Sequence, residues 1–211
     1  MLVIFDCDGV LVDSEPLSNR ILAERLTAIG LPTTTEESIR DYMGRSWASC
    51  QALIEQRLGR ALPDDFADGY HGELYAALRS EVEPVAGIEA ALDAIGAPAC
   101  VASSGSHEKI RTSLGTTGLL ARFEGRIFSA ADVEHSKPAP DLFLHAAAAM
   151  GHAPADCVVV EDAPAGVAAG RAAGMTVLGY AALTPPAELE GATVFTSMAE
   201  LPALLNGSAP R

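Results

Sequence analysis

Leu2-Val3-Ile4-Phe5-Asp6-Cys7-Asp8-Gly9 is the stretch that decides the fold of this chain. Four apolar residues in a row are typical of a strand that is buried on both faces, as in a parallel sheet. Ligands of such sheets bind just beyond the carboxyl ends of the strands. Asp6 and Asp8 are therefore expected where chemistry is normally done, and Gly9 lets the chain turn sharply there.

Asp6 and Asp8 are close enough in the chain to repel each other as carboxylates. They stay ionised only if a cation or a strong donor compensates them. Mg²⁺ is the simplest cation for this purpose, because it is a hard ion that prefers oxygen ligands. The alternative is that the two acids merely end a strand and form a turn.

The composition is that of an acidic protein with an ample core. The chain has 211 residues, 49% of them hydrophobic, and a formal net charge of −14. This charge disfavours nucleic acids and anionic membranes as partners, because binding to either needs a positive surface. His145, His152 and Arg171 interrupt the apolar stretches, so none is long enough to span a bilayer. We therefore expect a small-molecule partner, without nucleic acid or membrane.

The N-terminus and the cysteines favour a cytoplasmic location. Met1 leads directly into the first strand, without the basic segment of a secretory signal. The four cysteines show no C-x-x-C spacing, and we expect them to be reduced, buried, small apolar groups. No coiled-coil pattern occurs, and we expect a monomer. The cysteines are Cys7, Cys50, Cys100 and Cys157.

The hydrophobic pattern is helical throughout residues 14–83. Ser14 is expected to cap the first helix, with Pro16 in its first turn. We expect no strand in this segment, which predicts an all-helical domain inserted after the first strand. Its expected helices cover residues 14–30, 35 to an interruption at 43–46, 47–58 and 64–79.

Strands alternate with helices in the rest of the chain, which predicts a parallel sheet with helices on both faces. We therefore predict an α/β fold: a Rossmann-like core of residues 1–13 and 84–211, with residues 14–83 inserted as a helical domain. Residues 206–211 are expected to form a loose tail. The later strands are expected at 99–103, 126–129, 157–161, 176–179 and 193–195, and the helices at 88–95, 108–114, 140–150 and 165–173.

Ser103-Ser104-Gly105-Ser106 directly follows the second core strand. Hydroxyls and backbone N–H groups at a helix entrance form an anion site. The same residues also suit an ordinary helix cap before Glu108, so both interpretations stay open.

Lys137 lies in the loop Ser136-Lys137-Pro138-Ala139-Pro140, where prolines restrict the backbone. A lone lysine in a loop is usually just solvated. An ammonium that is presented rigidly, however, suits a negative cluster of phosphate and carboxylates.

Glu161 and Asp162 close the best strand of the chain and repeat the pattern of Asp6 and Asp8. Acids from two strand ends form a cage that fits octahedral Mg²⁺ with waters and a phosphate oxygen. The alternative is that Asp162 caps the following helix.

Taken in chain order, these motifs resemble the four motifs of the haloacid dehalogenase superfamily. The helical segment resembles the small four-helix cap of that family, and the likeness covers nearly the whole chain. Within the superfamily the chain is similar to the β-phosphoglucomutase-like sugar-phosphate phosphatases. Asp6–Glu15 and Ala97–Val101 look most like the 6-phosphogluconate phosphatases. The motifs are Asp6-x-Asp8-Gly9-x-x-x-Asp13, Ser103, Lys137-Pro138 and Glu161-Asp162.

The resemblance implies an Mg²⁺-dependent phosphoric monoester hydrolase that acts on sugar phosphates, 6-phosphogluconate among the candidates. Asp6 is the implied nucleophile, which forms an aspartyl-phosphate. Asp8 is the implied proton donor to the leaving group and then the base for water, and it gives a backbone carbonyl to the metal.

The resemblance also implies which residues bind the metal and the phosphate. Asp162 is an implied direct ligand of Mg²⁺, beside Asp6 and Asp8, whereas Glu161 is either a ligand or an outer-shell acceptor. The implied phosphate-binding residues, which stabilise the transferring group, are Ser103, Ser104, Gly105 and the catalytic Lys137.

Arg45 lies in the implied cap and is either a residue that reaches a substrate anion or hydroxyl, or a surface residue. The cap is expected to close over the substrate, with hinges at Val12–Ser14 and Glu81–Gly87.

Two other functions remain as alternatives. β-Phosphoglucomutases tend to carry a histidine in the first cap helix, and Glu15-Pro16-Leu17-Ser18-Asn19 has none, which favours hydrolysis over a mutase. A dehalogenase is disfavoured because Asp8 suits an alkoxide leaving group. The alternative outside enzymes is a module that binds a phospho-ligand without turnover.

Overall fold

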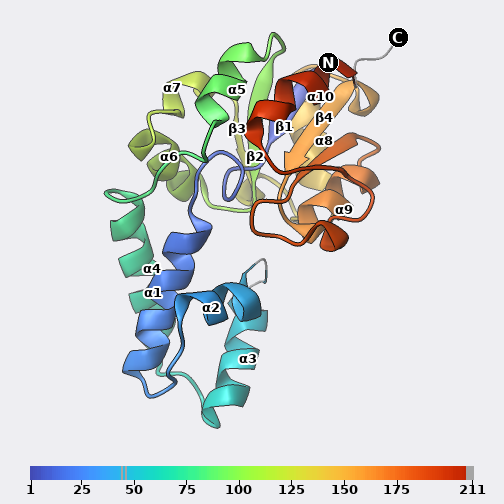
Figure 1. Ribbon diagram of the computed structural model, residues 1–211. Helices are drawn as coiled ribbons and strands as arrows, with labels where there is room; N and C mark the ends of the chain where they lie inside the picture. The colour runs from blue at the N-terminus through green and yellow to red at the C-terminus, as the bar shows by residue number, and fades with distance from the viewer. Residues whose placement is uncertain (44, 46, 208–211) are drawn as a thin grey trace. The chain divides into compact units, whose positions relative to one another are not determined.

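The computed structural model describes residues 1–43, 45 and 47–207 (Figure 1). The chain divides into two compact units, one of Asp13–Val82 and one of Met1–Val12 with the described residues from Glu83 onward. The expected interruption at 43–46 and the expected tail at 206–211 lie partly outside the described residues. Among the helices of the described chain, none has the length and apolar character that a bilayer crossing needs.

The larger unit is built on six strands, all paired in parallel, in the order β3-β2-β1-β4-β5-β6. In β1, Val3 lies opposite Ala99 of β2 on one side and Val158 of β4 on the other. This order is that of doubly wound sheets, and it reverses between β1 and β4, where such sheets bind ligands. The strands are β1 Leu2–Phe5, β2 Ala99–Ser103, β3 Ile127–Ser129, β4 Cys157–Glu161, β5 Thr176–Tyr180 and β6 Thr193–Phe195.

Helices cover both faces of this sheet. Leu2 and Ile4 of β1 are fully buried in a cluster with residues of α8 and α9. The ring of Phe5 points to the opposite face, where its centroid lies 6.2 Å from that of Phe123 in α7. The apolar run of β1 is thus buried on both faces, and the predicted α/β fold is confirmed (Figure 1).

The predicted alternation of strands and helices holds along the larger unit, and the structure adds the short helices α7 and α10 and four 3₁₀ turns to its described residues. Asn206 and Gly207 close α10, so these two residues do not belong to the expected loose tail. The helices are α5 Ile88–Ala94, α6 His107–Thr116, α7 Leu120–Phe123, α8 Asp141–Ala149, α9 Pro164–Ala172 and α10 Leu201–Gly207. The 3₁₀ turns are η1 Ala130–Asp132, η2 Pro154–Asp156, η3 Pro186–Glu188 and η4 Met198–Glu200.

The described residues of the smaller unit are helical, as predicted. Thr34 begins α2 with a capping box, in which the Glu37 N–H donates to Thr34 Oγ1 over 3.2 Å and the Thr34 N–H donates to Glu37 Oε2 over 2.8 Å. The partly buried indole of Trp47 stacks on Tyr70 at 5.4 Å between centroids. Its helices are α1 Glu15–Ala28, α2 Thr35–Tyr42, α3 Trp47–Leu58 and α4 Phe66–Leu78.

The expectation that the Ser14 side chain caps α1 is wrong. Ser14 occupies the cap position, but its side chain makes no capping hydrogen bond. The physical reason is its backbone, which is helical at φ −87° and ψ −18°, whereas a capping side chain usually needs an extended residue. Pro16 lies in the first turn, as expected.

Candidate active site

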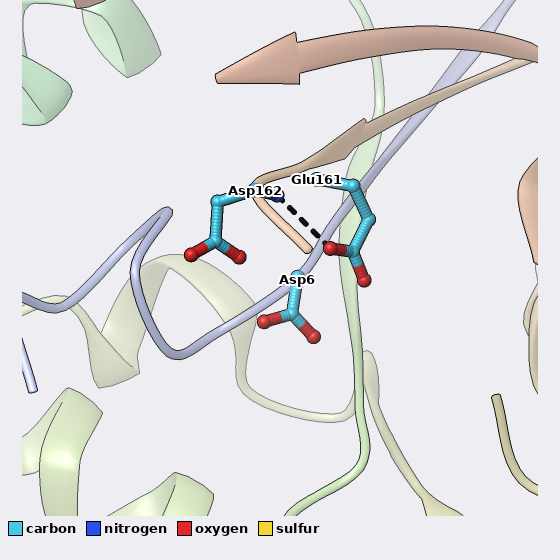
Figure 2. Close-up of side chains that lie close together, drawn as sticks. All are labelled: Asp6, Glu161 and Asp162. Carbon is cyan, nitrogen blue, oxygen red and sulfur yellow. Dashed lines mark hydrogen bonds between the residues drawn. The ribbon is translucent and has the colours of Figure 1, made fainter. Parts of the chain in front are cut away.

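Asp6 and Glu161 meet at the point where the strand order of the sheet reverses. Asp6 directly follows β1, and its N–H donates to the carbonyl of Val160 in β4 over 2.9 Å. Glu161 is the last residue of β4 and is 1% exposed. Asp6, Glu161 and Asp162 each place one carboxylate oxygen within 4.8 Å of the others (Figure 2). The structure thus brings together three of the four acids that the sequence predicts for a metal site.

Gly9 makes the turn after β1 that lets Asp162 approach. Its φ is +74°, which is a conformation that residues with a side chain rarely adopt. A Cβ at this position would overlap the Asp162 carboxylate. Gly166 has the same relation to Glu161, because a Cβ there would overlap the Glu161 carboxylate. Two glycines therefore make room for the two acids that follow β4.

Lys137 ties the acids of β1 and β4 together. Its ammonium donates to Asp6 Oδ1 at 2.6 Å, to Glu161 Oε1 at 2.7 Å and to the carbonyl of Ala102 at 2.9 Å. The side chain is 4% exposed and its Nζ lies 4.8 Å from the centroid of the Phe143 ring. All three N–H donors of the ammonium are therefore used within the site. The peptide bond between Lys137 and Pro138 is cis.

The environment of this cluster shifts the pKa values of both partners of the ion pair, Lys137 and Asp6. Burial lowers the pKa of Lys137, but the charges and hydrogen bonds of Asp6 and Glu161 outweigh burial and raise it. Burial raises the pKa of Asp6 to about 7, with Glu161 and Asp8 adding to the rise and Lys137 opposing it. Lys137 therefore does not offset the burial of Asp6, which disfavours the ionised carboxylate.

Glu161 is oriented by donors on both of its oxygens. Oε1 accepts from Lys137, and Oε2 accepts from the backbone N–H groups of Asp162 at 2.9 Å and Ala163 at 3.0 Å. Figure 2 shows the Asp162 hydrogen bond and the carboxylate of Asp162 turned toward that of Asp6. This arrangement suits Asp6 and Asp162 for direct contact with a cation, and Glu161 for the support of its neighbours.

Asp8 is held by a lysine that the sequence motifs do not single out. Its Oδ2 lies 2.8 Å from the Nζ of Lys109, which belongs to the first turn of α6. The two side chains are 18% and 25% exposed, so this ion pair is partly buried. One signal in the sequence points to it: the chain has two lysines, Lys109 and Lys137. Each of the two lysines forms an ion pair with an acid that follows β1.

Three of the residues predicted to bind phosphate, Ser103, Ser104 and Gly105, lie at the carboxyl end of β2. Ser103 is 1% exposed, and its Oγ accepts from the Gly105 N–H over 3.2 Å. Ser129 Oγ donates to the carbonyl of Gly105 over 2.7 Å and so fixes this loop. The helix cap belongs to Ser106, whose Oγ accepts from the N–H of Lys109. Ser103 and Gly105 therefore do not cap α6, and the helix-cap interpretation does not apply to them.

Ser104 and Arg45 complete the predicted set. Ser104 Oγ lies 3.5 Å from Ser136 Oγ, which belongs to the loop of Lys137. Arg45 lies in the smaller unit, where its Nε donates to the carbonyl of Asp41 over 2.9 Å. A role of Arg45 toward substrate stays a prediction.

The donor set fits a divalent cation. Asp6, Glu161 and Asp162 each place a carboxylate oxygen within 4.8 Å of the others. Oxygen ligands of this kind suit Mg²⁺, and its positive charge would offset the acids of the cluster. The pKa of Asp6 is raised first by burial and then by the negative charges of Glu161 and Asp8, and all three disfavour its ionised form.

Comparison with known proteins gives the same family that the motifs resemble. The model of the haloacid dehalogenase-like hydrolases matches residues 1–174. The chain is 34% identical to 6-phosphogluconate phosphatase of Escherichia coli K12 over 96% of this chain and 93% of that one. It is 33% identical to fructose-1-phosphate phosphatase YqaB of the same organism, over 82% and 92% of the two chains.

A solved structure extends the likeness to the fold. A HAD family hydrolase from Deinococcus radiodurans R1, determined with bound phosphate and sodium, superposes with a TM-score of 0.82. The two chains are 32% identical, and the match covers 98% of this chain and 95% of that one. On its motifs, its sheet and these matches, the chain belongs to the haloacid dehalogenase-like hydrolases.

Proposed function

We propose that this hydrolase is an Mg²⁺-dependent phosphatase of sugar phosphates that works through an aspartyl-phosphate on Asp6. The enzyme is a phosphoric monoester hydrolase of its family. One observation carries the mechanism: Asp6 lies beside Asp162 and shares the ammonium of Lys137 with Glu161. A carboxylate so placed is a usable nucleophile, because cationic groups stabilise the charge that builds up on phosphorus.

Asp6 forms the first new bond. Its Oδ1 is held by Lys137, which leaves the other oxygen to attack phosphorus. As that O–P bond forms, the bond from phosphorus to the sugar oxygen breaks, and Asp8 gives its proton to the leaving oxygen. Mg²⁺ bound at Asp6 and Asp162 would neutralise negative charge on the nucleophile and on the phosphoryl group.

Asp8 then reverses its role. It takes a proton from water as the water oxygen attacks phosphorus, and the bond between Asp6 and phosphorus breaks. Inorganic phosphate leaves, and Asp6 returns as a carboxylate. Ser103, Ser104, Gly105 and Lys137 would hold the phosphoryl oxygens during both steps, because hydroxyl, N–H and ammonium donors stabilise them.

The substrate class rests on the names of the relatives. Two enzymes about one-third identical to this chain are named for 6-phosphogluconate and for fructose 1-phosphate. Both compounds are phosphate esters of polyhydroxylated carbon chains with an alkoxide leaving group. We propose the same class for this enzyme, with 6-phosphogluconate as the first compound to test.

The mutase alternative is disfavoured by the residues of the first helix of the smaller unit. Residues 15–19 contain no histidine, and Asn19 is engaged in packing rather than in chemistry. Its amide donates to the carbonyl of Glu15 over 2.8 Å and accepts from Ser38 Oγ over 2.9 Å. We propose that Asp13–Val82 acts as the cap of the enzyme, with hinges near Val12–Ser14 and Glu81–Gly87.

The test measures phosphate release from a panel of sugar phosphates, including 6-phosphogluconate and β-glucose 1-phosphate, with Mg²⁺ and with EDTA. Release that depends on Mg²⁺ and is lost in Asp6→Asn supports the proposal. Conversion of β-glucose 1-phosphate to glucose 6-phosphate without release of phosphate supports the mutase instead. A melting temperature that rises with phosphosugar, without any turnover, supports a binding module.

A further inference from the structure

Both lysines of the chain contact an acid that follows β1. The other twelve basic residues are arginines, and both lysines pair with an acid of the turn after β1. Lys137 bonds Asp6, the residue with a proposed role as nucleophile, whereas Lys109 bonds Asp8. A lysine presents a compact point charge on a flexible stem, which suits a single contact with one carboxylate oxygen.

The contact holds Asp8 through a carboxylate oxygen. Lys109 Nζ lies 2.8 Å from Asp8 Oδ2, and this ion pair gives the side chain a defined direction. Asp8 lies beyond the end of β1, in an isolated bridge with Val12, and its side chain is 18% exposed. The partly buried ion pair with Lys109 restricts the rotation of this side chain.

Lys109 is itself fixed from two sides. Its N–H donates to Ser106 Oγ, which caps α6. Its side-chain stem passes close to Ser103 and Gly105, which are predicted to bind phosphate. A Cβ added to Gly105 would lie 3.4 Å from Lys109 Cδ and 3.5 Å from Ser103 Oγ. The stem therefore runs beside the predicted phosphate-binding residues on its way to Asp8.

We propose that Lys109 is a positioning residue that holds Asp8 in the orientation needed for proton transfer. The inference rests on the proposed function, in which Asp8 gives a proton to the leaving oxygen. Without the Lys109 ammonium, Asp8 still has its carboxyl group, but the ion pair no longer orients its side chain. Misplacement of a reacting group by about an ångström lowers a rate by roughly 100-fold.

The leaving group of the substrate distinguishes this role from a merely structural one. A sugar alkoxide needs a proton as it departs, whereas p-nitrophenolate departs without one. The quantity to compare is kcat/KM, which covers the reaction up to the transfer of the phosphoryl group to Asp6. Lys109→Met keeps the stem and removes the ammonium. We expect kcat/KM to fall roughly 10- to 100-fold for the sugar phosphate and less than about threefold for p-nitrophenyl phosphate.

Arg111→Met is the matched control on the same helix. Arg111 pairs with Glu124 at 2.8 and 3.0 Å, and both side chains are largely exposed. This variant also replaces a cation of α6 by methionine and breaks an ion pair, but far from the acids. We expect unchanged kcat/KM on both substrates. Lys109→Arg is expected to restore part of the sugar-phosphate activity.

Equal losses of Lys109→Met on both substrates, or no loss on either, would overturn the proposal. NMR tests the pair without any turnover: selective ¹³C labelling of lysine gives two sets of side-chain signals, because the chain has two lysines. The set that is absent in Lys109→Met belongs to Lys109, and it is expected to shift in Asp8→Asn. A Lys109 signal that does not move overturns the contact. A wild-type chain that releases no phosphate while this signal shifts contradicts the proposed function alone.

Discussion

Lys137 Nζ lies 2.6 Å from Asp6 Oδ1, and this pair joins the loop before α8 to the turn after β1 across 131 residues of chain. The same ammonium reaches Glu161, so a single cation serves two buried acids. An interaction of this kind has consequences for both stability and catalysis, because its loss leaves charges that water cannot reach.

Lys137→Met is expected to lower both activity and stability. Removal of one partner from a buried ion pair lowers the free energy of unfolding by about 3–5 kcal/mol. Loss of one cationic donor to a phosphoryl oxygen lowers kcat by roughly 100- to 1,000-fold. Urea unfolding and steady-state kinetics measure the two effects, with Arg111→Met as the exposed control. Wild-type stability in Lys137→Met would contradict the buried pair.

Gly9→Ala, compared with Gly118→Ala, distinguishes two effects. One is the loss of stability from a left-handed backbone, and the other is the loss of activity when Asp162 is displaced. The substitution puts a Cβ on a residue with φ +74° and into the Asp162 carboxylate. Gly118 is the matched control, because its φ is +75° and nothing lies within 4 Å of an added Cβ.

Both glycine variants are expected to lose about 1–2 kcal/mol of stability from the left-handed backbone. Gly9→Ala alone is expected to lose activity, since Asp162 has to move. Thermal melts and phosphate release provide the two readouts. Equal activity in Gly9→Ala and Gly118→Ala would show that the approach of Asp162 to Gly9 is not needed.

Mg²⁺ is expected to raise the melting temperature of the wild-type protein. A ligand that binds only the folded chain stabilises it by RT ln(1 + [L]/Kd), which is about 2.7 kcal/mol at 100 times Kd. Asp162→Asn removes one charged oxygen of the cluster and is expected to abolish most of this shift. Glu124 is an exposed acid that pairs with Arg111. Its replacement in Glu124→Gln is expected to keep the Mg²⁺-dependent shift in melting temperature. An undiminished shift in Asp162→Asn would place the metal elsewhere.

The thiols are expected to be inert in the folded protein. All four cysteines are buried and free, as the sequence predicts, and burial raises the pKa of Cys100 to about 12. Burial, with Asp8 and Asp6 adding to it, raises the pKa of Cys7 well above its usual value. A raised pKa means that the reactive thiolate is scarce at pH 8, so a disulfide reagent should find no rapidly reacting thiol until urea unfolds the chain. Rapid reaction of the native protein would contradict the buried environment.

The sequence carries enough information for the fold and for most of the site. Asp6 and Glu161 follow apolar runs that form neighbouring parallel strands, and the ends of such strands meet at one edge of the sheet. The helix expected from residue 35 is found as α2, which begins at Thr35. Both predictions depend on periodicity and on local spacing, which are the properties that a single sequence shows directly.

Lys109 was not predictable in the same way. It lies 101 residues from Asp8, and their contact depends on how α6 packs beside the sheet. No spacing rule covers such a distance. The capping expectation for Ser14 was wrong for a related reason, because the conformation of its backbone is set by its surroundings and not by its residue type.

The position of β1 in the middle of the sheet has a consequence for biosynthesis. β1 leaves the ribosome well before its neighbours β2 and β4, which begin at residues 99 and 157. The helical unit, by contrast, is one uninterrupted segment of the chain, Asp13–Val82. Contacts between nearby residues form faster than contacts between distant ones. The helical unit can therefore fold while β1 still waits for its partners, and the buried cluster of Asp6, Lys137 and Glu161 cannot form until Glu161 has been made.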